Sequence, residues 1–237
     1  MIFKKEYLPR IGDFDRFYNL SPEAALSIFE DAGNLHSMAV ARGVIEDSRN
    51  GLAWIITEWN YRFCRQPENG EKLIANTWTF GRLPSYAVNR NYRVTDENGN
   101  DILKCEGKFA IVDTDAGKPI KLTEELMAPY QPEEIYVFER GEFPRLREPK
   151  DPDGVTEVGL RKADTDYNGH LHNTKFISVA AQAVPDDFAK NVRDIQISYR
   201  TQLCGVKAYV RSKFEDGRYV MGIYDESDTL CALVSMK

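Results

Sequence analysis

The chain has 237 residues, of which 42% are hydrophobic and 29% charged, a composition typical of globular proteins with a buried core. With a net charge of −6, the chain lacks the dominant positive charge of most nucleic-acid-binding proteins, so we expect no nucleic-acid partner. No stretch approaches the roughly 20 apolar residues that span a bilayer, so we expect a cytoplasmic protein without membrane insertion. Four scattered cysteines without Cys-x-x-Cys spacing argue against a zinc ribbon or a disulfide scaffold.

The first half of the sequence predicts a strand over residues 3–11, one long helix and then an antiparallel meander. Ser21-Pro22 is typical of an N-cap followed by proline at the first helical position. Apolar residues recur at helical spacing to about Ala41, which indicates a core helix that ends before Gly43. Four strands are expected next, separated by turn signals such as Asn98-Gly99: residues 52–63, 71–80, 86–95 and 102–112. A helix followed by a run of strands is an α+β arrangement.

Residues 131–153 differ from the rest in composition, because prolines and charges dominate them. Such a segment is typical of an extended connection over the surface. We therefore expect an N-terminal unit over residues 1–130, a linker over 131–153 and a C-terminal unit over 154–237, the last opening with a strand over 155–163.

The segment after that strand carries the strongest chemical signal. Five polar side chains alternate there: Asp164, Asp166, Asn168, His170 and His172. In extended backbone, alternate side chains point to one side. A histidine beside a carboxylate and an amide at a helix start has a mobile proton and nearby backbone donors, so we predict a chemical site. Helix caps and turns also use these residue types. No further cluster of histidine or cysteine completes a zinc ligand set with His170 and His172, so no metal and no other cofactor is expected.

The segment from Asp166 to Phe176, Asp-Tyr-Asn-Gly-His-Leu-His-Asn-Thr-Lys-Phe, resembles the Asp-x-Asn-x-His-Val-Asn-Asn-x-Lys-Tyr signature of acyl-ACP thioesterases. These enzymes end fatty-acid synthesis by hydrolysing acyl chains from acyl carrier protein. Further similarity lies in 75–78, 90–94 and 111–113, so the resemblance extends over nearly the full length. It implies a tandem (double) hotdog fold, each unit a long helix wrapped by an antiparallel β-sheet, and acyl carrier protein bearing a fatty acyl chain as the partner.

The resemblance also implies roles for individual residues. Asp166, Asn168 and His170 correspond to the working residues: the histidine would move a proton, the aspartate would orient it, and the asparagine would hold water or the thioester carbonyl. The backbone N–H groups of Gly169 and His170, near the helix start, are the expected oxyanion hole. An acyl-serine route lacks its Gly-x-Ser-x-Gly signature.

Two positions depart from the family pattern. The family carries a glutamate on the next strand, just after a Tyr-Arg pair, where this chain has Gln202. Glutamine can hold a water but cannot take a proton, so Gln202 stays a catalytic candidate with a weakened role. Cys204 lies two places further on, where strand alternation would put it on the same side as Gln202, and it is either a nucleophile or a small core residue. His172, where the family has asparagine, is a further possible site residue.

The two halves resemble copies of one another, in a register that places Asn19 at the position of His170 and Ser21 at that of His172. This predicts a single active site, in the second unit. In the first unit, four helix residues would either form an apolar wall for a fatty chain or fill a core: Leu26, Phe29, Ala32 and Leu35.

Three functions remain open at this point. The leading one is hydrolysis of fatty acyl-ACP to free fatty acid. The alternatives are an acyl-CoA thioesterase, or a non-catalytic module that binds acyl groups or acyl carrier protein and has lost the strand glutamate. Acyl carrier proteins are acidic, so the leading function requires a local basic patch, whose candidates are Arg145, Arg147, Lys150, Arg161 and Lys162.

Overall fold

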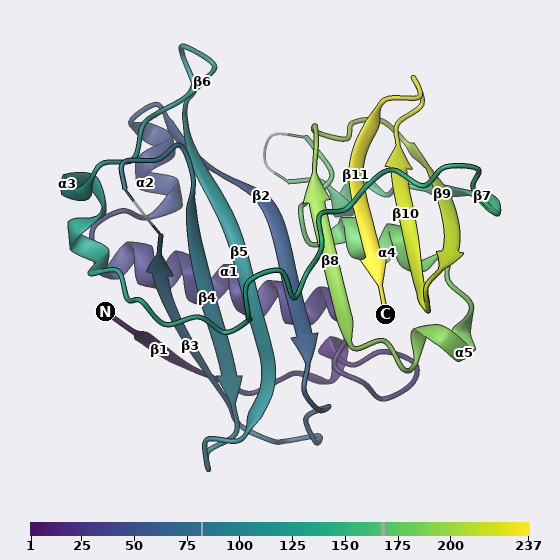
Figure 1. Cartoon of the computed structure of the whole chain (residues 1–237), viewed down its shortest axis with the longest axis horizontal. Helices are drawn as coiled ribbons and strands as arrows, with labels where there is room; N and C mark the ends of the chain where they lie inside the picture. The colour runs from purple at the N-terminus through teal and green to yellow at the C-terminus, as the bar shows by residue number, and fades with distance from the viewer. Residues whose placement is uncertain (82, 167–168) are drawn as a thin grey trace.

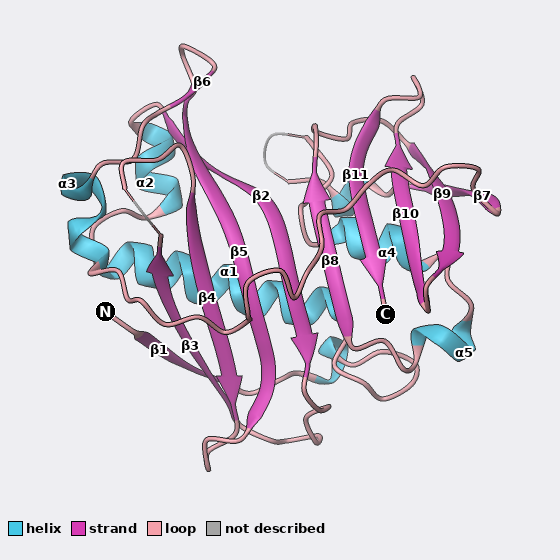
Figure 2. Ribbon diagram, viewed as in Figure 1, coloured by secondary structure: helices cyan, strands magenta, loops and turns pink. Residues whose placement is uncertain are grey.

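The computed structural model describes residues 1–81, 83–166 and 169–237. Within them, 11 strands form a single antiparallel sheet, ordered β1-β3-β4-β5-β2-β8-β11-β10-β9-β7, with β6 paired to β5 (Figures 1 and 2). The strands are β1 (Phe3–Tyr7), β2 (Leu52–Phe63), β3 (Leu73–Phe80), β4 (Val88–Thr95), β5 (Asp101–Asp113), β6 (Lys118–Pro119), β7 (Gly154–Gly159), β8 (Asp194–Tyr199), β9 (Lys207–Glu215), β10 (Arg218–Tyr224) and β11 (Leu230–Met236).

Each of the six strands predicted with bounds is present, most of them with shifted ends, and the structure adds β6 and β8 to β11. The second strand has the predicted bounds, whereas β3 and β4 each begin two residues later than expected. The predicted strand over 3–11 stops at Tyr7 and is followed by the 3-10 helix η1 (Ile11–Asp13). The predicted strand over 155–163 stops at Gly159 and is followed by η3 (Lys162–Asp164). A 3-10 helix of three residues is too short to show a hydrophobic periodicity of its own, so the sequence pattern does not separate it from the strand before it.

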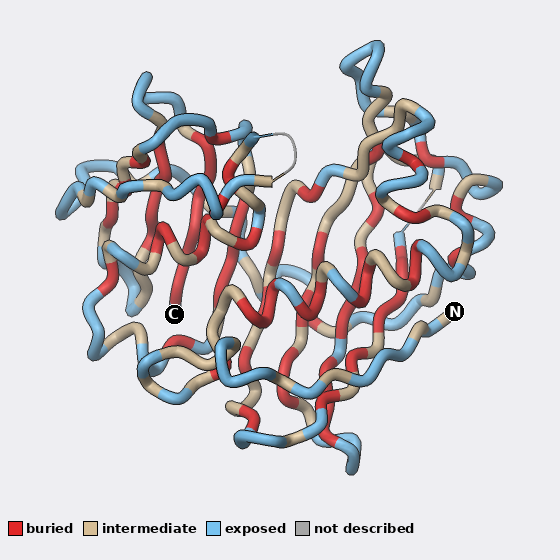
Figure 3. The backbone as a smooth tube through the Cα atoms, turned by 180° about the vertical axis from the view of Figure 1, so that it is seen from behind, coloured by how far each residue is buried: buried red, intermediate tan, exposed pale blue. Residues whose placement is uncertain are grey.

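The long helix α1 (Pro22–Ala39) crosses one face of the β1–β5 half of the sheet (Figure 1). The Ser21 hydroxyl accepts the Ala24 N–H at 3.1 Å, which satisfies one of the free donors at the helix start. Phe29 fills the interface with the sheet, its ring centroid 5.2 Å from that of Tyr92 and 6.0 Å from that of Trp59. Figure 3 shows that buried residues lie along the strands and recur along the helix, where they alternate with exposed ones.

The second half has a shorter helix, α4 (Lys175–Ala181), which packs on β9, β10 and β11. It ends before Pro185, because proline cannot continue a helix and restricts the residue before it. The Glu23 carboxylate, on α1, accepts hydrogen bonds from Lys175 and Ser178 and so joins the two helices. The remaining helices are α2 (Val44–Arg49), α3 (Glu124–Met127), η2 (Ala128–Tyr130) and α5 (Asp186–Ala189).

Residues 131–153 contain neither helix nor strand and run across the sheet face opposite α1 (Figure 1). The Ile135 carbonyl oxygen accepts the indole N–H of Trp78 at 2.9 Å and the amide of Asn91 at 2.8 Å. Tyr136 packs edge-on against Phe80, with ring centroids 4.9 Å apart. These contacts hold the segment to the sheet. The unit boundaries at 130 and 153 stay a prediction.

The two halves of the sheet are joined by β2 and β8, which pair over residues 58–62 and 194–198 only. The first part of β2 and the chain after β8 then diverge (Figure 1). Of the helices in the described ranges, none is both long and apolar enough to cross a membrane.

Candidate active site

A cavity of about 670 Å³ opens where β2 and β8 diverge. Its apolar wall includes Trp54, Ile56 and Phe109, from β2 and β5. Helix α1 lines the cavity instead with polar residues, among them Glu30, Asp31, Asn34 and Ser37. Leu26, Phe29, Ala32 and Leu35 are not among the lining residues. The first three are fully buried in the core, so they fill it, as one of the two alternatives predicted, and Leu35 is half-buried.

The predicted motif forms a tight turn whose side chains reach this cavity. Both Asp166 and His170 line it. The Asp166 N–H donates to the His170 carbonyl at 2.8 Å, and the His170 N–H donates back to Asp166 Oδ1 at 3.1 Å. Gly169 takes a φ of +79°, a conformation that favours glycine, and its N–H donates to the Asp166 carbonyl at 3.0 Å. Asn168 lies outside the described residues. The N–H groups of Gly169 and His170, the predicted oxyanion donors, both donate hydrogen bonds within the turn. Their role stays a prediction, and it requires these hydrogen bonds to open when substrate binds.

The first half contains the same turn without the histidine. The Asp15 N–H donates to the Asn19 carbonyl at 2.8 Å, and the Asn19 N–H donates to Asp15 Oδ1 at 3.0 Å. The Asn19 side chain then donates to the Lys190 carbonyl at 2.9 Å. The copy in the first half is therefore structural, whereas the His170 copy borders a cavity.

His172 also lines the cavity, and its ring is held on both sides. Its Nδ1 accepts the Thr174 N–H at 3.4 Å and lies 3.0 Å from the Thr174 hydroxyl. Its Nε2 lies 3.9 Å from Glu30 Oε2, on α1. Asp164, the first member of the alternating row, does not join them. Its carboxylate is nearly buried and binds the Arg161 guanidinium at 2.7 and 2.9 Å, which lowers the pKa of Asp164.

Glu30 is the site residue that the sequence analysis missed. Burial raises its pKa from 4.5 to about 7, the neighbouring Asp31 adds to the rise, and a hydrogen bond with the Asn173 side chain opposes it. The only local signal is a polar stripe formed by Glu30, Asn34 and Ser37 on the helix, and such a stripe normally marks the solvent-facing side.

The chain after β8 places the remaining candidates. Gln202 lines the cavity, and its role in holding water stays a prediction. Residues 200–206 form no strand, so the strand alternation expected to bring Cys204 beside Gln202 does not apply. Cys204 is exposed and is not among the lining residues, while Leu203 between them is fully buried.

The third histidine lies deeper in the first half. His36 is fully buried, and its Nδ1 lies 2.8 Å from Nη1 of Arg90, a residue of β4 that lines the cavity. Burial and the adjacent guanidinium lower the pKa of His36 to about 3, so the ring is neutral and accepts the Arg90 hydrogen bond.

No curated protein sequence matches the chain. The chain is similar in structure to a 12:0-ACP thioesterase from Umbellularia californica, with a TM-score of 0.85, 17% identity and coverage of 100% of this chain and 96% of that one. It is also similar to an acyl-ACP thioesterase from Bacteroides thetaiotaomicron VPI-5482, with a TM-score of 0.87, 14% identity and coverage of 99% and 96%. These likenesses confirm the α+β tandem hotdog fold. The family model of the acyl-ACP thioesterase N-terminal domain matches residues 1–130, more than half of the sequence. The chain therefore belongs to the acyl-ACP thioesterase family.

Proposed function

We propose that this chain hydrolyses the thioester of a fatty acyl group on acyl carrier protein, releasing free fatty acid, and that the reaction takes place in the cavity described above. Membership of the acyl-ACP thioesterase family supports thioester hydrolysis. The cytoplasmic location and the unit boundaries expected from the sequence belong to the same proposal.

One observation carries the assignment of the site: a single cavity joins an apolar wall to the polar motif. The indoles of Trp54 and Trp59 and the ring of Phe109 suit an alkyl chain, whereas Asp166 and His170 suit the thioester. We assign the acyl chain to the first half and the reacting carbonyl to the second. Gln202 would then hold water or the carbonyl oxygen from the far side.

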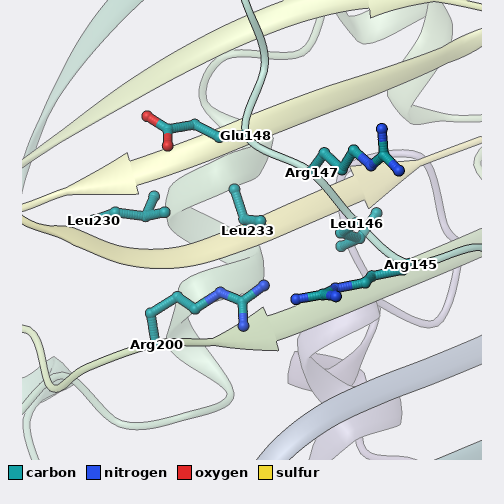
Figure 4. A pocket seen from close by; sticks show the side chains of 7 residues that line it. All are labelled: Arg145, Leu146, Arg147, Glu148, Arg200, Leu230 and Leu233. Carbon is teal, nitrogen blue, oxygen red and sulfur yellow. The ribbon is translucent and has the colours of Figure 1, made fainter.

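The carrier protein is assigned to the sheet face crossed by the linker. There, Arg145 and Arg147 line a hollow of about 370 Å³ together with Arg200 (Figure 4). The guanidinium groups of Arg145 and Arg200 point toward one another, which suits an anion between them. Arg200 lines both this hollow and the cavity, so a phosphopantetheine arm could bind its phosphate in one and present its thioester to the other. The Arg161 charge is engaged by Asp164 and contributes less to this patch.

A hydrolysis panel tests the proposal. Wild-type protein and the His170→Ala variant are incubated with acyl-ACP and acyl-CoA of several chain lengths, and the released fatty acid is quantified by chromatography. A thiol reagent is unsuitable, because the exposed Cys204 would react with it. We expect acyl-ACP to be the better substrate and His170→Ala to lose most activity. Release of no fatty acid from any substrate would overturn the proposal.

The second candidate is a non-catalytic module that binds acyl-ACP, and Gln202 at the place of the family's glutamate favours it. This candidate predicts binding of acyl-ACP without release of acid, so the same panel separates the two functions when binding is measured in parallel.

A further inference from the structure

Hydrolysis needs a group that takes a proton from water, and the cavity offers few. Among the described residues, the imidazoles of His170 and His172 line it, and so do three carboxylates: Glu30, Asp31 and Asp166. Asp166 Oδ1 accepts the His170 N–H, so this oxygen holds the turn. Gln202 cannot accept a proton in the working range of pH.

Glu30 is positioned for this task by three elements. Helix α1 presents its side chain to the cavity, with 28% of the side chain exposed. The segment before α4 places Nε2 of His172 at 3.9 Å and the Asn173 side chain within hydrogen-bonding reach. Tyr199 of β8 donates its hydroxyl hydrogen to the Asn173 carbonyl at 2.8 Å and thereby steadies this segment.

The tautomer of His172 follows from its other nitrogen. A backbone N–H, that of Thr174, donates to Nδ1, so the neutral ring carries its proton on Nε2, which faces Glu30. A water molecule between the two groups would donate one hydrogen to the carboxylate and accept the Nε2 hydrogen. The separation of 3.9 Å leaves room for this arrangement, and catalytic contacts tighten when substrate binds.

We propose that Glu30 is the general base of the hydrolysis and that His172 is a positioning residue that orients the attacking water. This inference rests on the proposed function. The water oxygen bonds to the thioester carbonyl carbon while its proton passes to Glu30. The tetrahedral intermediate then collapses, the C–S bond breaks, and the proton on Glu30 passes to the leaving sulfur, which gives a carboxylic acid and a thiol.

The surroundings of Glu30 suit a base that works near neutral pH. The titratable groups around it are Asp31 on α1, His172, Tyr92 on β4 and Tyr199 on β8. Burial is the first cause of its raised pKa and Asp31 the second. A base with a pKa near the working pH is both ionised and strong enough to take the proton.

The test compares Glu30→Gln with Asp31→Asn, a matched neutralisation one residue away. With acyl-ACP, we expect Glu30→Gln to lower kcat at least about 100-fold while KM changes little, because the amide keeps the shape but cannot take a proton. Asp31→Asn should move the acid limb of the pH profile of kcat to lower pH, since the charge that raises the Glu30 pKa is gone. His172→Gln, which keeps a side-chain donor, should retain more activity than His172→Ala.

The outcomes separate the two proposals. If the wild type hydrolyses acyl-ACP and Glu30→Gln keeps its kcat, the base assignment is wrong and the proposed function stands. If the wild type releases no fatty acid, both are wrong. If Glu30→Gln does not fold, the Asp31→Asn pH profile decides, and an unmoved acid limb overturns the assignment.

Discussion

Replacing Glu30 by glutamine is expected to stabilise the fold at about pH 8 and to change it little at about pH 5. The pKa of Glu30 is raised from 4.5 to about 7 by burial and by Asp31. The folded protein therefore holds this proton more tightly than the unfolded chain does, and stability falls as the pH rises from the unfolded to the folded pKa. Glutamine does not ionise and avoids this loss.

The magnitude follows from the displacement of the pKa. The step from 4.5 to about 7 corresponds to roughly 3 kcal/mol, since one pKa unit is worth about 1.36 kcal/mol. The Glu30 side chain is 28% exposed, so solvent in the cavity screens part of the penalty. We expect Glu30→Gln to gain about 1–3 kcal/mol in free energy of unfolding at the alkaline end.

The pH profile of the wild type would not reveal this effect by itself, because His36 acts in the opposite direction. Its pKa is lowered from 6.5 to about 3, so the unfolded chain holds the extra proton between these values and stability rises with pH. The Glu30 and His36 slopes therefore oppose each other between pH 4.5 and 6.5. Subtracting the wild-type curve from the Glu30→Gln curve removes the His36 contribution.

The assay is urea unfolding followed by tryptophan fluorescence at several pH values, with Glu134→Gln as the control. Glu134 is exposed on the linker, so its neutralisation should change stability by less than about 0.5 kcal/mol at every pH. A Glu30→Gln gain that is the same at both ends of the range, or that is larger at the acid end, would refute the reasoning.

Three further predictions concern other parts of the molecule. The double variant Arg145→Glu, Arg147→Glu should raise KM for acyl-ACP about tenfold at low salt with kcat unchanged, and an effect that salt does not reduce would contradict it. Gly107→Ala should lower the free energy of unfolding by about 1–3 kcal/mol, because its Cβ would lie 2.6 Å from the Trp59 ring; wild-type stability in urea would show that the ring moves freely. Gly169→Ala should cost about 1 kcal/mol and lower kcat, because alanine is strained at a φ of +79°; unchanged kcat and stability would disprove this.

The sequence by itself determined the local elements and one wall of the site. Ser21-Pro22 predicts the start of α1 because capping is a property of adjacent residues. The motif predicts that His170 and His172 lie on one side, and both line the cavity, although the backbone from Asp166 to His170 is a turn and not the extended segment that the alternation assumes. Strand alternation failed at Cys204, because β8 ends at Tyr199 and the chain beyond it is irregular.

Only the tertiary structure decided which group completes the site. Glu30 belongs to a polar helical stripe that periodicity alone assigns to solvent. Docking of the two halves at the β2–β8 junction covers that stripe and brings the glutamate within 3.9 Å of His172. The reactivity of a carboxyl group depends on its burial and on neighbours distant in the sequence, and both come from the packing of the halves.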